Sequence, residues 1–225
     1  MTVEPMEPFR FHSCEMAIVS TGLVARTLSE LRDCVRRAPE GSLHTHFWGW
    51  KMRPQLGERE YTNDLANWVA STLRDRGMAE KLSALSPKDF EDLDSLREEI
   101  ISVLDRRLEG DDAMAWSRAS HPFFFTDSRM LVFDTGQTAS TLKEFREAIR
   151  TIDTNSIFYH VIDAVRRTPG HEDDFSAWLS GFGELTANLR ARLRRIDTAL
   201  LTLGEIREKI NSAIRKSLPW EGDEQ

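Results

Sequence analysis

Apolar residues recur at helical spacing through most of the chain. The clearest patterns run over residues 93–108 and 203–218, where an apolar side chain returns every three or four positions. Short apolar runs at 17–19 and 130–133 are typical of strands instead. Asp134-Thr135-Gly136 follows the second run and is typical of a turn, because glycine adopts positive φ easily. The pattern predicts a mainly α fold with small β-hairpins.

The two halves of the sequence resemble each other. With an offset of 114, residues 8–47 match a second segment at 14 of 40 positions, far more than unrelated sequence would. Further along the chain the offset falls to 110. We therefore predict an internal duplication that forms two tandem pseudo-symmetric α-rich repeats, residues 8–110 and 122–218. The termini, residues 1–7 and 219–225, are expected to be flexible.

Both repeats carry the start signal of a helix after the predicted strand. Thr27 and Glu30 have the Thr-x-x-Glu spacing of a capping box, and so do Thr141 and Glu144. In this motif the hydroxyl accepts a hydrogen bond from the third backbone N–H, and the carboxylate reaches back to the cap. The sequence predicts a helix from each threonine onward.

A further helix in each repeat is predicted to bury a tryptophan. It begins near Thr62 in the first repeat and near Asp173 in the second. Trp68 and Trp178 then fall at matching positions on its apolar side, beside a leucine or a phenylalanine. Both indole rings are therefore expected in the core.

Composition narrows the class of protein. The 225 residues include 37 acidic and 30 basic side chains, for a net charge of −7, and 40% are hydrophobic. The longest apolar stretch, residues 16–25, is too short to span a membrane. Glu4 and Glu7 are unlike the basic start of a secretory signal. Two cysteines cannot form a disulfide framework, and we expect a cytoplasmic protein.

The repeated motifs resemble an uncharacterised bacterial and archaeal family of unknown function. They are Thr21-Gly22, residues 27–32, residues 42–46 and residues 63–68, each with a counterpart in the second repeat. The second repeat departs from the pattern by placing Asp173 where the first has asparagine. The resemblance covers nearly the whole chain, and it implies no established activity.

His46, His160, Asp64 and Asp174 form the sharpest set of candidate site residues. Two imidazoles and two carboxylates suffice for a transition-metal site if all four converge, and one His–Asp pair would suffice as a general base. The alternative is structural: each histidine bonds to a carbonyl or to the aspartate of its own repeat, and the aspartate caps the tryptophan helix. The spacings differ between the repeats and match no compact ligand motif. The structural alternative is favoured, and neither a metal nor another cofactor is predicted.

Aromatic residues cluster on a predicted loop at residues 47–52, in the first repeat only. Trp48 and Trp50 would stack on a sugar or anchor a partner there. Packing between the repeats would explain the same cluster equally well.

Arginines recur on the first helix of each repeat. Arg32 and Arg146 occupy matching positions and could clamp a carboxylate or a phosphate. Ion pairing with nearby acidic residues such as Asp33 and Glu147 is the favoured alternative.

A local excess of basic residues lies near the end of the chain. Residues 190–216 contain eight basic and three acidic side chains. No base-reading motif or glycine-rich phosphate loop accompanies them, so nucleic acid is not favoured.

The repeated residues are mostly helix caps, core positions and helix charges. This favours a non-enzymatic interaction or regulatory module that acts at the junction of the two repeats and binds a protein partner. A homo-oligomer is left open, and no membrane contact is expected. One alternative is a metal-assisted or acid–base enzyme that uses the repeated His/Asp pairs. Another is a carbohydrate-binding accessory protein that uses the aromatic loop.

Overall fold

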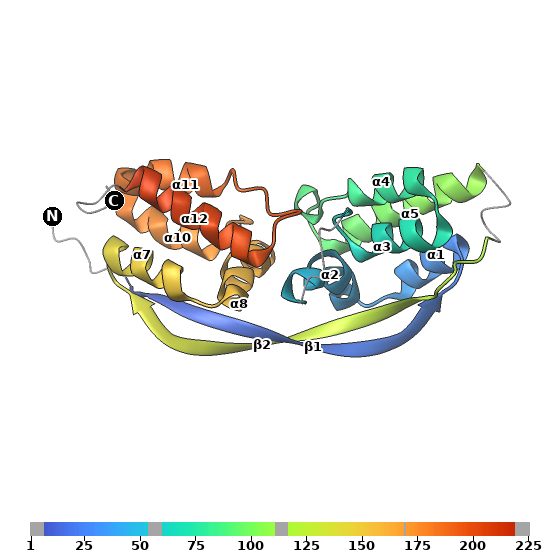
Figure 1. The fold of residues 1–225 in the computed structure, drawn as a ribbon, viewed down its shortest axis with the longest axis horizontal. Coiled ribbons are helices and arrows are strands. Elements are labelled where there is room, and N and C mark those ends of the chain that lie inside the picture. The colour runs from blue at the N-terminus through green and yellow to red at the C-terminus, as the bar shows by residue number, and fades with distance from the viewer. Residues whose placement is uncertain (1–6, 54–59, 111–116, 169, 219–225) are drawn as a thin grey trace. The chain divides into compact units, whose positions relative to one another are not determined.

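The protein divides into two compact units. The computed structural model describes residues 7–53, 60–110, 117–168 and 170–218 (Figure 1). One unit, here the continuous unit, spans Met16–Met130, and the other, the split unit, combines Met1–Glu15 with Leu131–Gln225. Apart from Glu7, the termini that were expected to be flexible lie outside the described residues.

The two strands pair with each other. β1 (Phe9–Ala25) and β2 (Phe123–Ala139) form a two-stranded antiparallel sheet. The prediction of a local hairpin in each repeat is therefore wrong. Gly22 and Gly136 do have positive φ, 75° and 74°, but they lie inside the long strands and do not reverse the chain. A single residue of this conformation bends or twists a strand, and the remote strand then satisfies its backbone groups.

Each compact unit takes its strands from both halves of the sequence. In the continuous unit the Thr21 hydroxyl donates to the Phe125 carbonyl over 2.7 Å. In the split unit the Thr135 hydroxyl donates to the Phe11 carbonyl over 2.6 Å. The start of each strand therefore packs with the helices of the other repeat. The compact units divide the chain at different places from the repeats, whose bounds of 8–110 and 122–218 remain a prediction.

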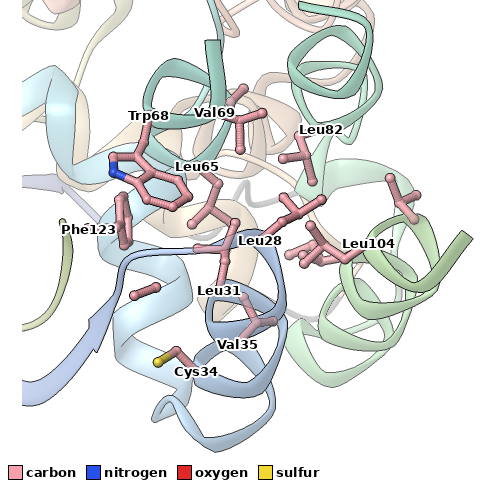
Figure 2. Close-up of a cluster of buried hydrophobic side chains, with 14 of the residues drawn as sticks. Leu28, Leu31, Cys34, Val35, Leu65, Trp68, Val69, Leu82, Leu104 and Phe123 are labelled. Carbon is pink, nitrogen blue, oxygen red and sulfur yellow. The ribbon is translucent and has the colours of Figure 1, made fainter. Parts of the chain in front are cut away.

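The helices of the continuous unit enclose an apolar core (Figure 2). They are α1 (Leu28–Arg37), α2 (Glu40–Trp48), α3 (Asp64–Trp68), α4 (Arg76–Ser83) and α5 (Leu93–Glu109), with 3-10 turns at Gly49–Met52 and Pro87–Asp89 and a π-helical turn at Val69–Leu73. Figure 2 shows Phe123 of β2 beside Trp68 of α3, and their ring centroids are 5.7 Å apart. The start of β2 is thus part of this core.

The split unit has its own helical set. It comprises α7 (Leu142–Thr151), α8 (Thr154–Ile157), α9 (Ala164–Arg167), α10 (Asp174–Leu179), α11 (Ala187–Leu193) and α12 (Leu203–Ser217), with a π-helical turn at Phe158–Asp163 and a 3-10 segment at Ser180–Thr186. Phe9 and Phe11 of β1 pack here against Phe145 and Phe175. Across the described ranges, no helix combines the length and apolarity that a membrane crossing requires.

The predicted threonine caps are confirmed. Thr27 accepts from the Glu30 N–H over 3.1 Å, and Thr141 accepts from the Glu144 N–H over 3.2 Å. Each glutamate carboxylate binds the N–H of the residue before the threonine and not that of the cap itself. One free N–H in the first turn of each helix is therefore satisfied by the threonine side chain.

The two tryptophans are buried to different extents. Trp68 is 7% exposed, as predicted. Trp178 is half-buried, and its ring stacks on Phe145 at a centroid distance of 5.3 Å. The prediction that both rings are core residues is correct for Trp68 and only partly correct for Trp178.

Candidate functional site

His46 lies on α2 and bonds through both of its ring nitrogens. Its Nε2 accepts from the Thr126 N–H over 3.1 Å, and its Nδ1 lies 3.1 Å from Oδ2 of Asp64. Arg53 approaches the same carboxylate oxygen at 3.6 Å. We call this group, within the continuous unit, the His46 site.

His160 repeats the arrangement in the split unit. Its Nε2 accepts from the His12 N–H over 2.9 Å, and its Nδ1 lies 2.8 Å from Oδ2 of Asp174. Arg167 donates to this oxygen over 3.0 Å. We call this group the His160 site.

The bonds determine the protonation state of both rings. A backbone N–H can only donate, so Nε2 must carry a lone pair and the imidazole is neutral. The proton is then on Nδ1, which donates to the aspartate. Each histidine therefore accepts a hydrogen bond from the backbone N–H of a strand residue, and its hydrogen bond to the aspartate fixes the orientation of the ring. Both rings are almost fully buried, which leaves neither nitrogen for a substrate.

The pKa of His160 is lowered from its ordinary value. Burial among aromatic rings is the largest cause, because it penalises the charged imidazolium, and the Asp174 carboxylate opposes it. Phe9 and Phe175 lie 4.9 and 5.4 Å from the imidazole, centroid to centroid. These surroundings stabilise the neutral form that the strand contact requires.

A buried ion-pair network extends the His160 site. Asp163 is 1% exposed, and its carboxylate accepts from Arg167 over 2.6 Å and from Arg166 over 3.1 Å. The Arg167 guanidinium also lies 4.0 Å above the Tyr159 ring. Arg167 therefore joins two carboxylates and one aromatic face, and it is held in a single place.

Asp64 and Asp174 bond to the histidines of their own repeats, as the structural alternative described. The helix caps are the residues before them: Asn63 accepts from the Ala66 N–H over 2.9 Å, and Asp173 accepts from the Ser176 N–H over 2.8 Å. The expectation that the paired aspartates themselves cap the helices is wrong. In the described part of the chain, no three His, Cys, Asp or Glu side chains gather as metal ligands would.

The segment predicted as an aromatic loop is helical. Residues 47–52 form the end of α2 and a 3-10 turn. Trp50 is 2% exposed, and its Nε1 donates to the Thr62 carbonyl over 3.1 Å. Trp48 is half-buried, with its ring 4.7 Å from that of His44. Because the Trp50 indole is enclosed, its position favours packing over stacking on a ligand.

The remaining candidates are also engaged within their units. Arg32 binds Asp33 over 2.9 Å and Asp105 over 3.1 Å, while Arg146 is half-buried and makes a contact of its own. Both thiols are buried, and burial together with nearby carboxylates raises the pKa of Cys14 to about 12. A thiol with such a pKa is a poor nucleophile at neutral pH.

Sequence reasoning missed the arginines and the strand contacts of both sites. Arg53 and Arg167 match at the offset of 114, as do the donor positions His12 and Thr126. The arginine identity was a usable signal, although it lies beyond the segment where that offset is obvious. The backbone N–H contacts left no signal in the sequence, because a backbone N–H donates in the same way whatever side chain the residue carries.

Comparison with known proteins places the chain in a family. No curated protein matches it significantly. Among solved structures, it is similar to OrfY from Thermoproteus tenax, with 27% identity and a TM-score of 0.78 over 94% of this chain and 95% of that chain. Residues 6–215 match the family of unknown function DUF5752. The chain therefore belongs to the DUF5752 family.

Proposed function

We propose that this protein is a non-enzymatic interaction module that associates through exposed apolar side chains on its strands. The observation that carries the proposal is the exposure of large apolar side chains on both strands. In the continuous unit Ile18 is 51% exposed and Val19 is similar, and in the split unit Leu131, Val132 and Phe133 are 45–59% exposed. Neighbouring exposed apolar residues on a folded protein mark a surface that is covered by another molecule.

Equivalent contacts in the two units support a scaffold built by duplication. Trp68 Nε1 donates to the His121 carbonyl over 2.8 Å, and Trp178 Nε1 donates to the Glu7 carbonyl over 3.0 Å. These donors match at the offset of 110 and the acceptors at 114. Such equivalent contacts, together with the two histidine sites, favour a tandem copy of one ancestral segment.

The chemistry of the histidine sites disfavours the enzyme alternative. A general base needs a free nitrogen within reach of substrate, and a metal ligand needs a free lone pair. Both rings are neutral and use both nitrogens inside the fold. Elemental analysis of protein purified without an affinity tag tests this: a stoichiometric metal would favour the enzyme alternative.

The partner we propose is a second copy of this chain. Residues 16–25 contain no charged side chain, and 130–133 contain none either. Strands that avoid association carry lysine, proline or inward charges, so these uncharged exposed segments of the strands are suited to packing against a like surface. Two copies that bury these side chains would remove the exposed apolar area from water.

Analytical ultracentrifugation over a range of protein concentrations tests the proposal. We expect a concentration-dependent dimer, and we expect Ile18→Glu and Phe133→Glu each to weaken it by about tenfold or more. Leu185→Glu is the matched control, because Leu185 is 66% exposed but belongs to the 3-10 segment and not to a strand. A wild-type protein that stays monomeric at every concentration, or a dimer that tolerates both strand variants, would contradict the proposal.

A further inference from the structure

A basic hollow lies in the split unit, away from the His160 site. It is an open hollow of about 440 Å³ between the end of α11, the following loop and one face of α12, and its cationic residues are exposed. Arg192 and Arg195 line one side of it, and Lys209 and Lys216 line the other. This volume is in the range of small-molecule sites.

The charges of the hollow are strongly unbalanced. Among the described residues that line it, four side chains are cationic and Asp197 is the one carboxylate. Asp197 accepts from the Ala199 N–H over 2.9 Å, so its carboxylate is bound to its own loop. Within the described residues, neither lysine forms an ion pair. Four cations against one carboxylate leave an excess of positive charge in the hollow, which favours a bound anion.

The matching helix of the continuous unit has no such imbalance. At the offset of 110, Lys209 corresponds to Glu99 and Lys216 corresponds to Arg106. In α5 these two residues neutralise each other, since Arg106 donates to Glu99 over 2.9 Å. The same two positions on α12 both carry a positive charge. The basic face therefore belongs to one unit only, and the packing of the helix does not require it.

The wall of the hollow combines charge with an apolar surface. Ile196, Leu201 and Ala213 lie among the cations, and Ser212 adds a hydroxyl on the α12 face. A guanidinium group can donate two parallel hydrogen bonds to the oxygens of a phosphoryl group, and the lysine ammonium groups add positive charge. The apolar residues offer contact to a carbon skeleton. A free inorganic ion would contact only the charged groups and not the apolar residues.

We infer that this hollow binds a small organic phosphate, held by Arg192, Arg195, Lys209 and Lys216 through its phosphoryl group. A long nucleic acid fits less well, because the protein as a whole carries a charge of −7 and would repel an extended polyanion. A small ligand, in contrast, would place its negative charge next to the basic hollow and not along the rest of the negatively charged protein.

Isothermal titration calorimetry on the full chain tests this site. The probes are AMP, inorganic phosphate and a 20-nucleotide single-stranded DNA, at moderate ionic strength. We expect saturable binding of AMP, weaker binding of inorganic phosphate, and weaker binding of the DNA per site. Lys209→Glu restores the charge that α5 has at this position, and it should weaken AMP binding by about tenfold or more.

Two further variants keep the result interpretable. Lys216→Gln should weaken AMP binding in the same direction, and Arg215→Gln should not, because Arg215 is exposed on α12 but does not line the hollow. Circular dichroism confirms the fold of each variant. Absence of saturable binding, binding that Lys209→Glu and Lys216→Gln leave unchanged, or a preference for the DNA would overturn the inference. None of these variants should alter self-association, so the proposal for this site and the proposal for the strand surface can be refuted independently.

Discussion

The His46 and His160 sites make the same bonds in different electrostatic surroundings. In both, a buried neutral imidazole joins a strand N–H to an aspartate. The arginine beside that aspartate is 3.6 Å away at Asp64 and 3.0 Å away at Asp174. At the His160 site the same arginine also binds the buried carboxylate of Asp163.

The difference shows which contacts the fold needs. The bonds that hold the start of each strand are present in both units, so they are part of the common scaffold. The sites differ in the carboxylates around their arginines, since Asp163 corresponds to Gly49 at the offset of 114, and the matching faces of α5 and α12 also differ in charge. On exposed helix faces charge tolerates change because each ion pair contributes little to stability, whereas an unpaired buried group is costly.

The largest expected effect separates the two tryptophans. Trp68→Ala should lower the free energy of unfolding by about 3–5 kcal/mol, because it leaves a cavity beside Phe123 and removes the bond to the His121 carbonyl. Trp178→Ala should cost less, since its ring is only half-buried. Urea titrations followed by circular dichroism measure both. Equal losses would show that the units bury their tryptophans equally.

The histidine variants test whether the two sites stabilise the start of the two strands equally. His46→Leu and His160→Leu keep a similar volume but leave one backbone N–H without its acceptor and remove one hydrogen bond from the aspartate, so each should cost about 2–3 kcal/mol. Hydrogen exchange gives the specific readout: the Thr126 amide should exchange faster in His46→Leu and the His12 amide in His160→Leu. Amides that keep their protection would show that the imidazoles do not hold the strands.

Acidification should weaken the His160 site. Burial lowers the pKa of this ring below its ordinary 6.5, so the folded protein binds the proton less readily than the unfolded chain does. The free energy of unfolding should therefore fall as the pH drops through 6.5, until the pH is below the folded-state pKa. Unfolding titrations of the wild type and of His160→Leu isolate this contribution by difference. A difference that does not vary with pH would contradict it.

The smallest expected effect compares the two threonine caps. Thr27→Ala and Thr141→Ala should each cost about 1 kcal/mol, because each removes one hydrogen bond to a free N–H of the first helical turn. The denaturation midpoint in urea reports the loss. Thr27→Ser serves as a control that retains the hydroxyl. An unchanged midpoint in either alanine variant would mean that water replaces the cap.

Much of the local structure could be predicted because its causes are local. The Thr-x-x-Glu spacing predicts the helix starts, and the apolar period predicts the buried sides of α5 and α12. The pairing of each histidine with the aspartate of its own repeat was among the predicted alternatives. The error at Asn63 and Asp173 was one position, because several neighbouring polar residues can cap the same helix.

The pairing of the strands could not be predicted in this way. Residues 17–19 and 130–133 have the composition of strands, but composition does not name a partner, and a nearby turn residue favoured a local hairpin. Two long strands that pair with each other satisfy more backbone groups than two short hairpins do. Each strand's pairing partner is selected by the sum of these hydrogen bonds and by the packing of Phe9 and Phe123 in the cores of the two units.

The sequence by itself determined the start of α1 and α7, the buried sides of α5 and α12, the matching of the two halves and the family, because each of these depends on residue type and spacing along the chain. Only the tertiary structure decided which unit holds the start of each strand, that the two imidazoles are neutral and fully bonded, and that four cations meet in one hollow. These depend on groups far apart in sequence, and a backbone N–H or an unpaired charge acquires its role only when folding brings its neighbours together.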